Sequence, residues 1–206
     1  MFITFEGIEG CGKTTQIELL FTYLKNKGYK VIRTREPGGT PFGEELREAF
    51  LRTESKVSSM CELLVFTAMR AQHVEEIIEP ALRNGIIVLC DRFSDATYAY
   101  QGFGRGLNLD TIDSLNQLAT RGLAPDVTIF MDLPAREGLL RKARSAKMDR
   151  FETEKISFHN RIRQGYKKLT KKEPDRFLII DATLDIGTIQ RHIRDKIRKA
   201  LRSNAI

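Results

Sequence analysis

The chain has 206 residues, of which 41% are apolar, so it can bury one sizeable core but is short for two full domains. Its net charge is +7, but acidic residues are interspersed among the basic ones along the chain. This pattern favours a mobile anionic substrate such as a nucleotide over a nucleic acid. Three widely spaced cysteines argue against a disulfide framework or a zinc site and fit a reducing cytoplasm. No apolar run reaches about 18 residues, and MFITFEGIEG lacks the features of a signal peptide, so we expect no membrane association.

Short apolar runs rich in β-branched residues alternate with stretches of helical periodicity. Near-continuous apolar runs are typical of strands that are covered on both faces of a parallel sheet. We therefore predict a doubly wound α/β fold, with a five-stranded parallel sheet, helices on both faces and right-handed crossovers. The predicted strands are Phe2–Phe5, Val31–Ile32, Ile86–Cys90, Val127–Met131 and Phe177–Ile180.

Helices are predicted between these strands from periodicity and from their end signals. Glycines just after the last periodic residue indicate helix ends, and Pro80 predicts a kink or a restart within the longest stretch. Asp110 is predicted to begin one helix. The last helix has one apolar face, because isoleucines recur every three or four residues. The predicted helices are Thr14–Lys27, Met60–Asn84, Asp110–Arg121 and a final one containing Ile186, Ile189, Ile193, Ile197 and Leu201.

The first strand is followed by Gly7–Thr14, GIEGCGKT, which satisfies the phosphate-loop pattern G-x-x-x-x-G-K-[ST]. Glycines let the backbone wrap a phosphate, and the next helix directs its N-terminal dipole at the anion. Lys13 can reach the β- and γ-phosphates, and the hydroxyl of Thr14 suits Mg²⁺. Cys11 is interpreted as a small filler residue. The residues predicted to bind the nucleotide are Gly7, Ile8, Glu9, Gly10, Cys11, Gly12, Lys13, Thr14 and Thr15.

The third predicted strand ends in Asp91-Arg92, where an open α/β sheet places its ligand crevice. Asp91 is predicted to hold Mg²⁺ directly or through water, and Arg92 to clamp phosphate. Alone, such a pair is as readily a surface salt bridge, but the phosphate loop favours the functional interpretation. Asp132 and Asp181 end later strands and give weaker versions of this signal, or simply mark strand ends.

Four strings in register resemble bacterial thymidylate kinases over nearly the whole chain. They are FEGIEGCGKTT at the start, Thr34–Thr40 (TREPGGT), Asp91–Gly102 (DRFSDATYAYQG) and Asp149–Glu152 (DRFE). The resemblance implies a single P-loop domain over residues 1–206, with nucleoside-monophosphate kinase architecture. It also implies transfer of the γ-phosphoryl group of MgATP to dTMP, giving dTDP and ADP for dTTP biosynthesis, and a homodimer packed through helices. The apolar stretches Leu63–Met69 and Leu115–Ala119 are candidates for that interface or for the core.

The resemblance also implies roles for individual substrate-binding residues. Phe66 stacks on the thymine and Arg70, four residues later on the same helix face, bonds a carbonyl of the base. Thr97 and Gln101 contact the base edge, and Tyr100 lies beneath the sugar and crowds its 2′ position. Without the resemblance, Phe66 would be assigned to the core and Arg70 to solvent. The remaining substrate residues are Glu9 near the 3′-hydroxyl, Glu36, and the arginines of the acceptor phosphate, Arg47 and Arg92; Glu9 is otherwise a solvated loop acid and Arg47 an exposed helix residue.

The phosphate loop contains no arginine, whereas one branch of the similar kinases places a catalytic arginine there. The other branch supplies it from a lid, so the resemblance assigns this chain to the lid-arginine type. The lid is predicted at about 141–152, with Arg141, Arg144 and Arg150 as candidates; the alternative is a basic helix facing solvent. Phe93 stands where many relatives carry Tyr or His, so a polar role there is absent.

No general base is required, because the second pKa of a phosphate monoester is about 6 and the acceptor is already an oxyanion near pH 7. His73, His159 and His192 have no metal or triad spacing and are interpreted as surface or packing residues. The nearest rival function is another small-acceptor P-loop kinase, for uridylate, adenylate or a deoxynucleoside. A P-loop switch or nucleic-acid-dependent ATPase is the rival from another class, and no interleaved aromatic and basic groove supports it.

Overall fold

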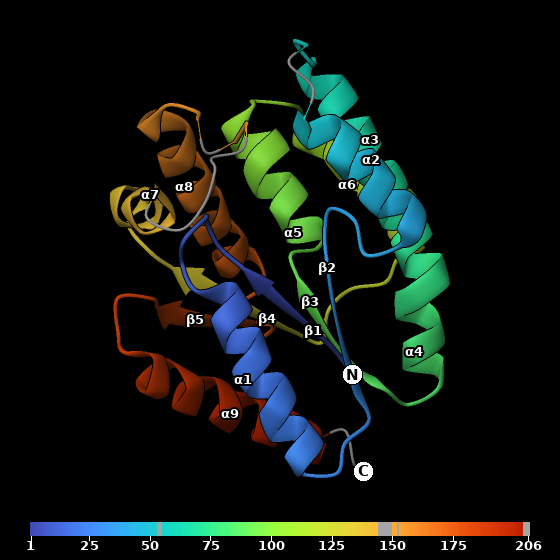
Figure 1. Cartoon of the computed structure of the whole chain (residues 1–206), viewed down its shortest axis with the longest axis vertical. Coiled ribbons are helices and arrows are strands. Elements are labelled where there is room, and N and C mark those ends of the chain that lie inside the picture. Colours follow the sequence, from blue (N-terminus) through green and yellow to red (C-terminus); the bar gives the residue numbers. More distant parts are fainter. Residues whose placement is uncertain (53–54, 144–149, 152, 204–206) are drawn as a thin grey trace.

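The computed structural model describes residues 1–52, 55–143, 150–151 and 153–203. A five-stranded parallel sheet in the order β2-β3-β1-β4-β5 forms its centre, as predicted (Figure 1). Its strands are β1 (Phe2–Glu6), β2 (Val31–Arg35), β3 (Ile87–Asp91), β4 (Val127–Asp132) and β5 (Phe177–Asp181).

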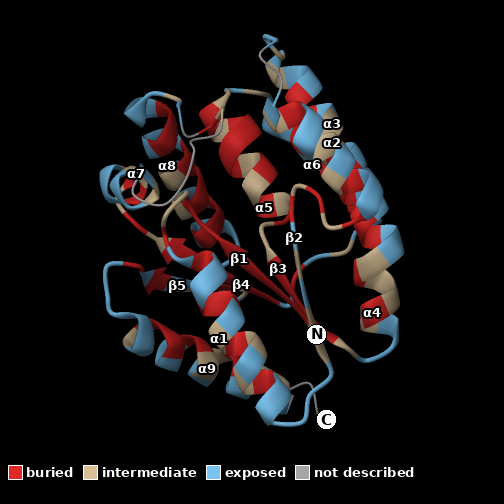
Figure 2. Ribbon diagram, in the orientation of Figure 1, coloured by how far each residue is buried: buried red, intermediate tan, exposed pale blue. Residues whose placement is uncertain are grey.

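Alternate residues of β1 reach two different hydrophobic clusters. Ile3 and Phe5 pack in the cluster that contains Leu20, whereas Phe2 packs in the one that contains Val74. Both faces of this central strand are therefore covered, which is the condition that its unbroken apolar run indicated. Figure 2 shows the resulting pattern, with buried strands inside helices whose outer faces are exposed.

The helices that follow the strands pack against one another as well as against the sheet. α1 (Lys13–Asn26) packs against α9 (Ile186–Ser203), while α3 (Ser59–His73) packs against α2 (Pro41–Arg52) and α6 (Leu109–Thr120) (Figure 1). The remaining helical elements are α4 (Glu79–Arg83), α5 (Ser94–Thr97), α7 (Ala135–Ala143), α8 (Ile156–Lys172) and the π-helical segments η1 (Val74–Ile78) and η2 (Tyr98–Gly104). Within the described ranges, no helix has the length and apolarity that crossing a bilayer requires.

Three predicted boundaries are corrected by the structure. Met60–Asn84 is not one regular helix: α3 passes into the π-helical η1, and Pro80 lies in the first turn of α4, where its missing N–H is tolerated. Asp110 does not begin α6, because Asn108 caps it by accepting a 2.9 Å bond from the Thr111 amide. β2 runs beyond Val31–Ile32 to Arg35. The apolar run ends early because Arg33 and Arg35 of this edge strand are exposed to solvent.

Candidate active site

The loop between β1 and α1 has the backbone that the phosphate-loop pattern predicts. Gly7 has φ 138°, and a Cβ there would lie 2.6 Å from the carbonyl oxygen of Met131. Only glycine fits such a position. The ammonium of Lys13 lies within the loop, where it donates to the carbonyl oxygens of Gly7 at 3.1 Å and Ile8 at 3.0 Å. A buried positive charge is thereby held at the start of α1.

A cleft of about 540 Å³ opens beside this loop, and we call it the donor cleft. Its wall is strongly cationic, because several arginines and lysines from distant parts of the chain converge there. The lining residues are Glu9, Gly10, Gly12, Lys13, Thr14, Thr15, Arg35, Glu36, Arg47, Asp91, Arg92, Arg141 and Lys142.

Thr14 and Asp91 meet in the donor cleft, as the two strand-end motifs predict. The Thr14 hydroxyl donates to Asp91 Oδ2 at 3.3 Å. Asp91 Oδ1 is shielded from solvent, and no group in the described part of the chain donates to it. A hydroxyl beside a carboxylate with a spare oxygen is the oxygen-rich donor set that Mg²⁺ prefers.

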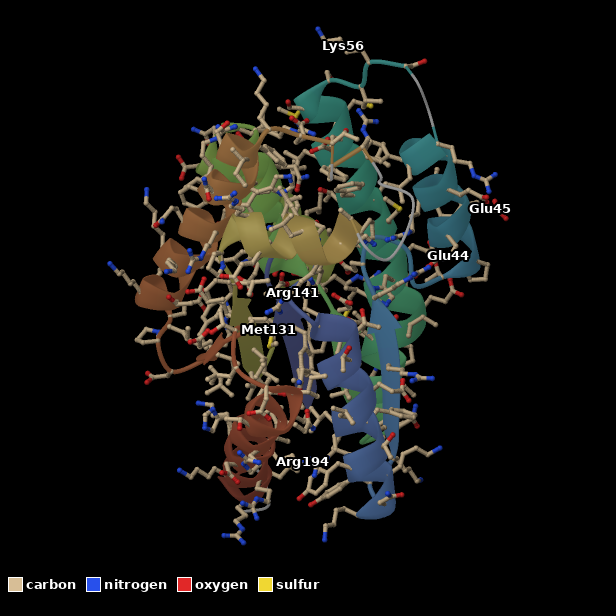
Figure 3. The ribbon with its side chains drawn as sticks, turned by 60° about the vertical axis from the view of Figure 1, so that its left-hand side comes forward. Glu44, Glu45, Lys56, Met131, Arg141 and Arg194 are labelled. Carbon is tan, nitrogen blue, oxygen red and sulfur yellow. The ribbon has the colours of Figure 1, made fainter. Side chains whose placement is uncertain are left out.

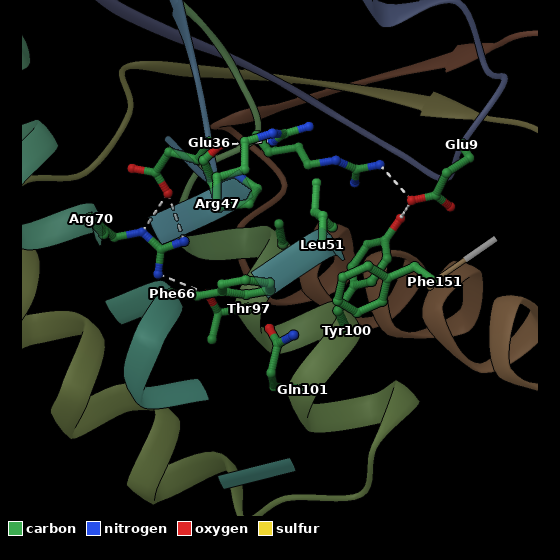
Figure 4. Close-up of a pocket in the computed structure, with 13 residues that line it drawn as sticks. Glu9, Glu36, Arg47, Leu51, Phe66, Arg70, Thr97, Tyr100, Gln101 and Phe151 are labelled. Atoms are coloured by element: carbon green, nitrogen blue, oxygen red, sulfur yellow. Dashed lines mark hydrogen bonds and ion pairs between the residues drawn. The ribbon is translucent and has the colours of Figure 1, made fainter. Parts of the chain in front are cut away.

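A second, smaller cavity of about 90 Å³ adjoins the donor cleft, and we call it the acceptor pocket (Figure 4). It brings together every residue that the resemblance assigned to the substrate, from six separate segments of the chain. The lining residues are Glu9, Glu36, Pro37, Arg47, Leu51, Phe66, Arg70, Arg92, Ala96, Thr97, Tyr100, Gln101 and Phe151.

Arg70 is buried in the wall of the acceptor pocket and is not solvated. Its Nε donates to Glu36 at 2.7 Å, and its Nη1 donates at 2.7 Å to both Thr97 Oγ1 and Asn116 Oδ1. Burial would raise the pKa of Glu36, but the charge of Arg70 outweighs this effect and holds the pKa below its ordinary value. Arg70 is thus fixed as a cation beside the cavity.

Glu9 and Arg92 join the two cavities. Arg92 has a left-handed backbone, with φ 71°, and its guanidinium donates to Gly7 O at 2.8 Å and to Glu9 Oε1 at 3.0 Å. Tyr100 also donates to Glu9 Oε1, at 2.6 Å, and the Arg92 guanidinium lies 4.8 Å from the centre of the Tyr100 ring. Burial would raise the pKa of Glu9, but the positive charge of Arg92 and these hydrogen bonds lower it below its usual range.

Two of the histidines that the sequence predicted to be surface or packing residues lie against carboxylates of the site. His73 is buried, with Nδ1 3.1 Å from Glu36 Oε1 and Nε2 2.6 Å from Thr34 Oγ1. His159 is buried, with Nδ1 3.7 Å from Glu9 Oε2. Helical spacing could have found His73, which follows Arg70 by three residues. No comparable signal exists for His159, which enters from α8.

Glu62 and Arg105 form a further charged group that sequence reasoning missed. Glu62 lies eight residues before Arg70 and shares its helix face, so spacing could have indicated it. Arg105 bonds both carboxylate oxygens of Glu62, and Gln101 of the acceptor pocket donates to the same side chain.

The predicted lid arginines have different surroundings. Arg141, labelled in Figure 3, lies in the last turn of α7 and lines the donor cleft. Its Nη1 donates to Ala182 O, just beyond β5, at 3.1 Å. The guanidinium of Arg150 lies 4.5 Å from the ring centre of Phe50. Phe50 stacks in turn on Phe151, which lines the acceptor pocket. Arg144 lies outside the described residues.

The weaker sequence signals have structural explanations. Asp132 forms ion pairs with Arg163 and Lys167 of α8, and Asp181 accepts bonds from Thr183 in its own turn. Phe93 is fully buried and packs edge-on against Phe2, so an apolar residue suits its place.

Comparisons with known proteins agree with this arrangement. The family model described as thymidylate kinase matches residues 5–193. A thymidylate kinase of Geotalea daltonii is 53% identical over 193 residues, covering 90% of each chain. One of Trichlorobacter lovleyi is 47% identical over 208 residues, covering 98% of each. A crystal structure of thymidylate kinase from Ehrlichia chaffeensis is similar with a TM-score of 0.80 and 39% identity, covering 96% of this chain and 98% of that one.

Proposed function

Because the chain belongs to the thymidylate kinase family, a phosphotransferase family that phosphorylates dTMP with ATP, we propose that its two cavities hold the two substrates. ATP occupies the donor cleft, and dTMP occupies the acceptor pocket. The observation that carries this division is that Glu9, Glu36, Arg47 and Arg92 line both cavities. The phosphate of the acceptor and the γ-phosphate of the donor therefore meet where the cavities join, at the two arginines of this shared set, Arg47 and Arg92.

On the donor side, residues Gly7 to Thr15 bind the triphosphate and Lys13 contacts the β- and γ-phosphates. Thr14 and Asp91 hold Mg²⁺, which neutralises charge on the β- and γ-oxygens when it is bound. The spare Oδ1 of Asp91 supports this assignment. The described residues offer no group of three His, Cys, Asp or Glu side chains for a metal, so the nucleotide and water supply the other ligands.

On the acceptor side, Arg92 and Arg47 bind the 5′-phosphate of dTMP. Phe66 stacks on the thymine, while Arg70, Thr97 and Gln101 contact its edge. The Tyr100 ring lies beneath the sugar and crowds the 2′ position, and Glu9 lies near the 3′-hydroxyl. Glu36 keeps Arg70 in place, and the ion pair between them supports that role.

Transfer requires alignment and cancellation of negative charge rather than a general base. The acceptor is already an oxyanion, so no proton has to be removed. Lys13, Arg92 and an arginine of the lid, residues 141–152, supply the positive charge; Arg141 already lines the donor cleft. Arginines of this kind contribute roughly 10³–10⁵ in rate in other phosphoryl-transfer systems.

The enzyme works as a homodimer in the cytoplasm, where dTDP enters dTTP synthesis. Exposed leucines on two helices that pack together support the dimer: Leu64 of α3 is 49% exposed and Leu118 of α6 is 77% exposed. Leu63 and Met69, the first and last residues of the stretch Leu63–Met69, are buried within the chain, so the exposed leucines carry the proposed interface.

A phosphate-acceptor screen with the purified protein tests the proposal. With MgATP, we expect dTMP to be the preferred acceptor and nucleic acid to leave ATP hydrolysis unchanged. Lys13→Ala should abolish most dTDP formation, because the lysine is the fixed charge at the transferred group. Near-normal turnover of that variant would refute the donor assignment. Preference for UMP, AMP or a deoxynucleoside would refute the acceptor assignment.

A further inference from the structure

Glu62 is a buried carboxylate that the proposed reaction leaves without a role. Its side chain is 1% exposed, and Arg105 holds both of its oxygens: Nε donates to Oε1 and Nη2 to Oε2, each at 3.2 Å. In this paired geometry each carboxylate oxygen accepts a hydrogen bond from the guanidinium. An ionised carboxylate has no proton to donate and only accepts hydrogen bonds.

Gln101 is the second partner of this carboxylate, and the contact fixes the direction of its amide. The Gln101 Nε2 donates to Glu62 Oε1 at 2.8 Å. Since the carboxylate accepts only, the NH₂ group must turn toward it, and the carbonyl oxygen must turn the other way. No group in the described part of the chain donates to that oxygen, and Figure 4 shows it on the side of Phe66 and Thr97. Gln101 therefore presents an acceptor to the acceptor pocket.

We infer that Glu62, held by Arg105, is a positioning residue that selects thymine over cytosine by fixing the amide of Gln101. Thymine carries a hydrogen at N3 and can donate to the carbonyl oxygen. Cytosine has a lone pair at N3, which faces that oxygen without a hydrogen. The inference rests on the proposed function, because it takes the base to lie beside Gln101.

The neighbouring contacts explain why the amide cannot simply rotate. Gln101 is 1% exposed and lies in the π-helical η2, a type of segment that often occurs at functional sites. Rotation would place its carbonyl oxygen against the carboxylate of Glu62. Two acceptors would then face each other in a buried site, which is a costly arrangement.

The test is a comparison of kcat/KM for dTMP, dUMP and dCMP in wild type and Glu62→Gln. A glutamine at position 62 both donates and accepts, so Gln101 can present either end of its amide. We expect the dTMP-to-dCMP ratio of kcat/KM to fall roughly tenfold or more, the size of effect that one hydrogen bond to the substrate commands. The dTMP-to-dUMP ratio should stay within about twofold, because both bases have N3–H.

The kcat/KM values that form each ratio are measured on one preparation of a variant. A reduced fraction of folded protein then lowers both values equally and cancels in the ratio. Glu62→Met, which removes the acceptor with an apolar side chain, gives a second variant if the first yields little folded protein. Glu154→Gln is the matched control, because Glu154 is the other ion-pair partner of Arg105, whereas the Gln101 amide donates to Glu62. It should retain the wild-type ratio.

The outcomes separate the inference from the function beneath it. A wild type that prefers dTMP, with an unchanged dTMP-to-dCMP ratio in both Glu62 variants, overturns the inference alone. An equal loss with all three substrates shows that Glu62 supports only the fold and also overturns it. A wild type without dTMP-dependent turnover refutes the proposed function itself.

Discussion

Glu36 and Arg70 are an ion pair almost completely withdrawn from water, with exposures of 4% and 3%. Such a pair stabilises the folded state little more than apolar side chains of similar volume would. Breaking the pair, however, leaves one charge buried without its partner. Thr97, Asn116 and the Phe93 carbonyl oxygen bond Arg70 as well. The pair therefore orients a guanidinium rather than adding much to the stability of the fold.

The pH dependence of stability tests this pair. The pKa of Glu36 lies below its ordinary value of 4.5, so the folded state binds this proton less readily than the unfolded chain. Its contribution is present above pH 4.5 and is lost as the pH falls through the folded-state pKa. Glu36→Gln should cost about 3 kcal/mol at pH 7 and progressively less below pH 4.5. Urea unfolding of both proteins from pH 3 to pH 7 measures the difference, and a constant difference would contradict the prediction.

From residue chemistry alone, without the family resemblance, single residues at the site were predictable only where a motif fixed them. Lys13, Thr14 and Asp91 follow from loop chemistry and from the position of strand ends. Arg70 does not follow from such chemistry, because a lone arginine on a helix is normally solvated. Its burial depends on Glu36, which comes from a loop far away in the sequence. His159 depends likewise on packing between α8 and the phosphate loop.

The phosphate loop and α7 approach each other at two glycines. A Cβ on Gly138 of α7 would collide with the Glu9 carbonyl oxygen, and a Cβ on Gly10 would collide with the Gly138 carbonyl oxygen. Backbone thus meets backbone at this contact, and the side chain of Ile8 lies beside Gly138. This contact sets the distance from the loop to Arg141, one turn further along α7.

Gly138→Ala tests the contact between these elements. The added methyl group must push α7 from the loop, so we expect a loss of about 1–3 kcal/mol in stability. The KM for ATP should rise as well, because the loop that binds its phosphates is displaced. Gly187→Ala in α9 is the control: its Cβ meets no backbone, and alanine there should be neutral or stabilise by up to about 1 kcal/mol. Equal denaturation midpoints and ATP kinetics in all three proteins would rule the contact out as a constraint.

Element type was more predictable than element boundaries. The apolar runs indicated all five strands, because buried parallel strands have no polar face to interrupt the pattern. The edge strand β2 was cut short for the opposite reason, since Arg33 and Arg35 break its run. The π-helical η1 could not be foreseen, because an extra residue in a turn leaves no compositional mark.

At the scale of the molecule, the proposed dimer can be tested through α6. Leu118 is 77% exposed, so Leu118→Glu should leave the protomer folded and place a charge in an apolar interface. We expect the mass in solution to fall from twice 23.5 kDa to 23.5 kDa, measured by light scattering. Leu184→Glu, at another exposed leucine outside α3 and α6, should remain dimeric. A dimer in both variants would exclude this face of α6.

The strand order also governs when the molecule can fold during its synthesis. β1 leaves the ribosome first, yet its two neighbours are β3 and β4, and β4 ends only at Asp132. At roughly 5–20 residues per second, several seconds or more of translation pass before this apolar strand can pair with both β3 and β4. Long-range parallel pairing is slow in any case. The strand that precedes the phosphate loop therefore stays incompletely paired until β4 has been made. Slowing translation before Val127 should increase aggregation of the nascent chain, measured by sedimentation, more than slowing it after Asp132.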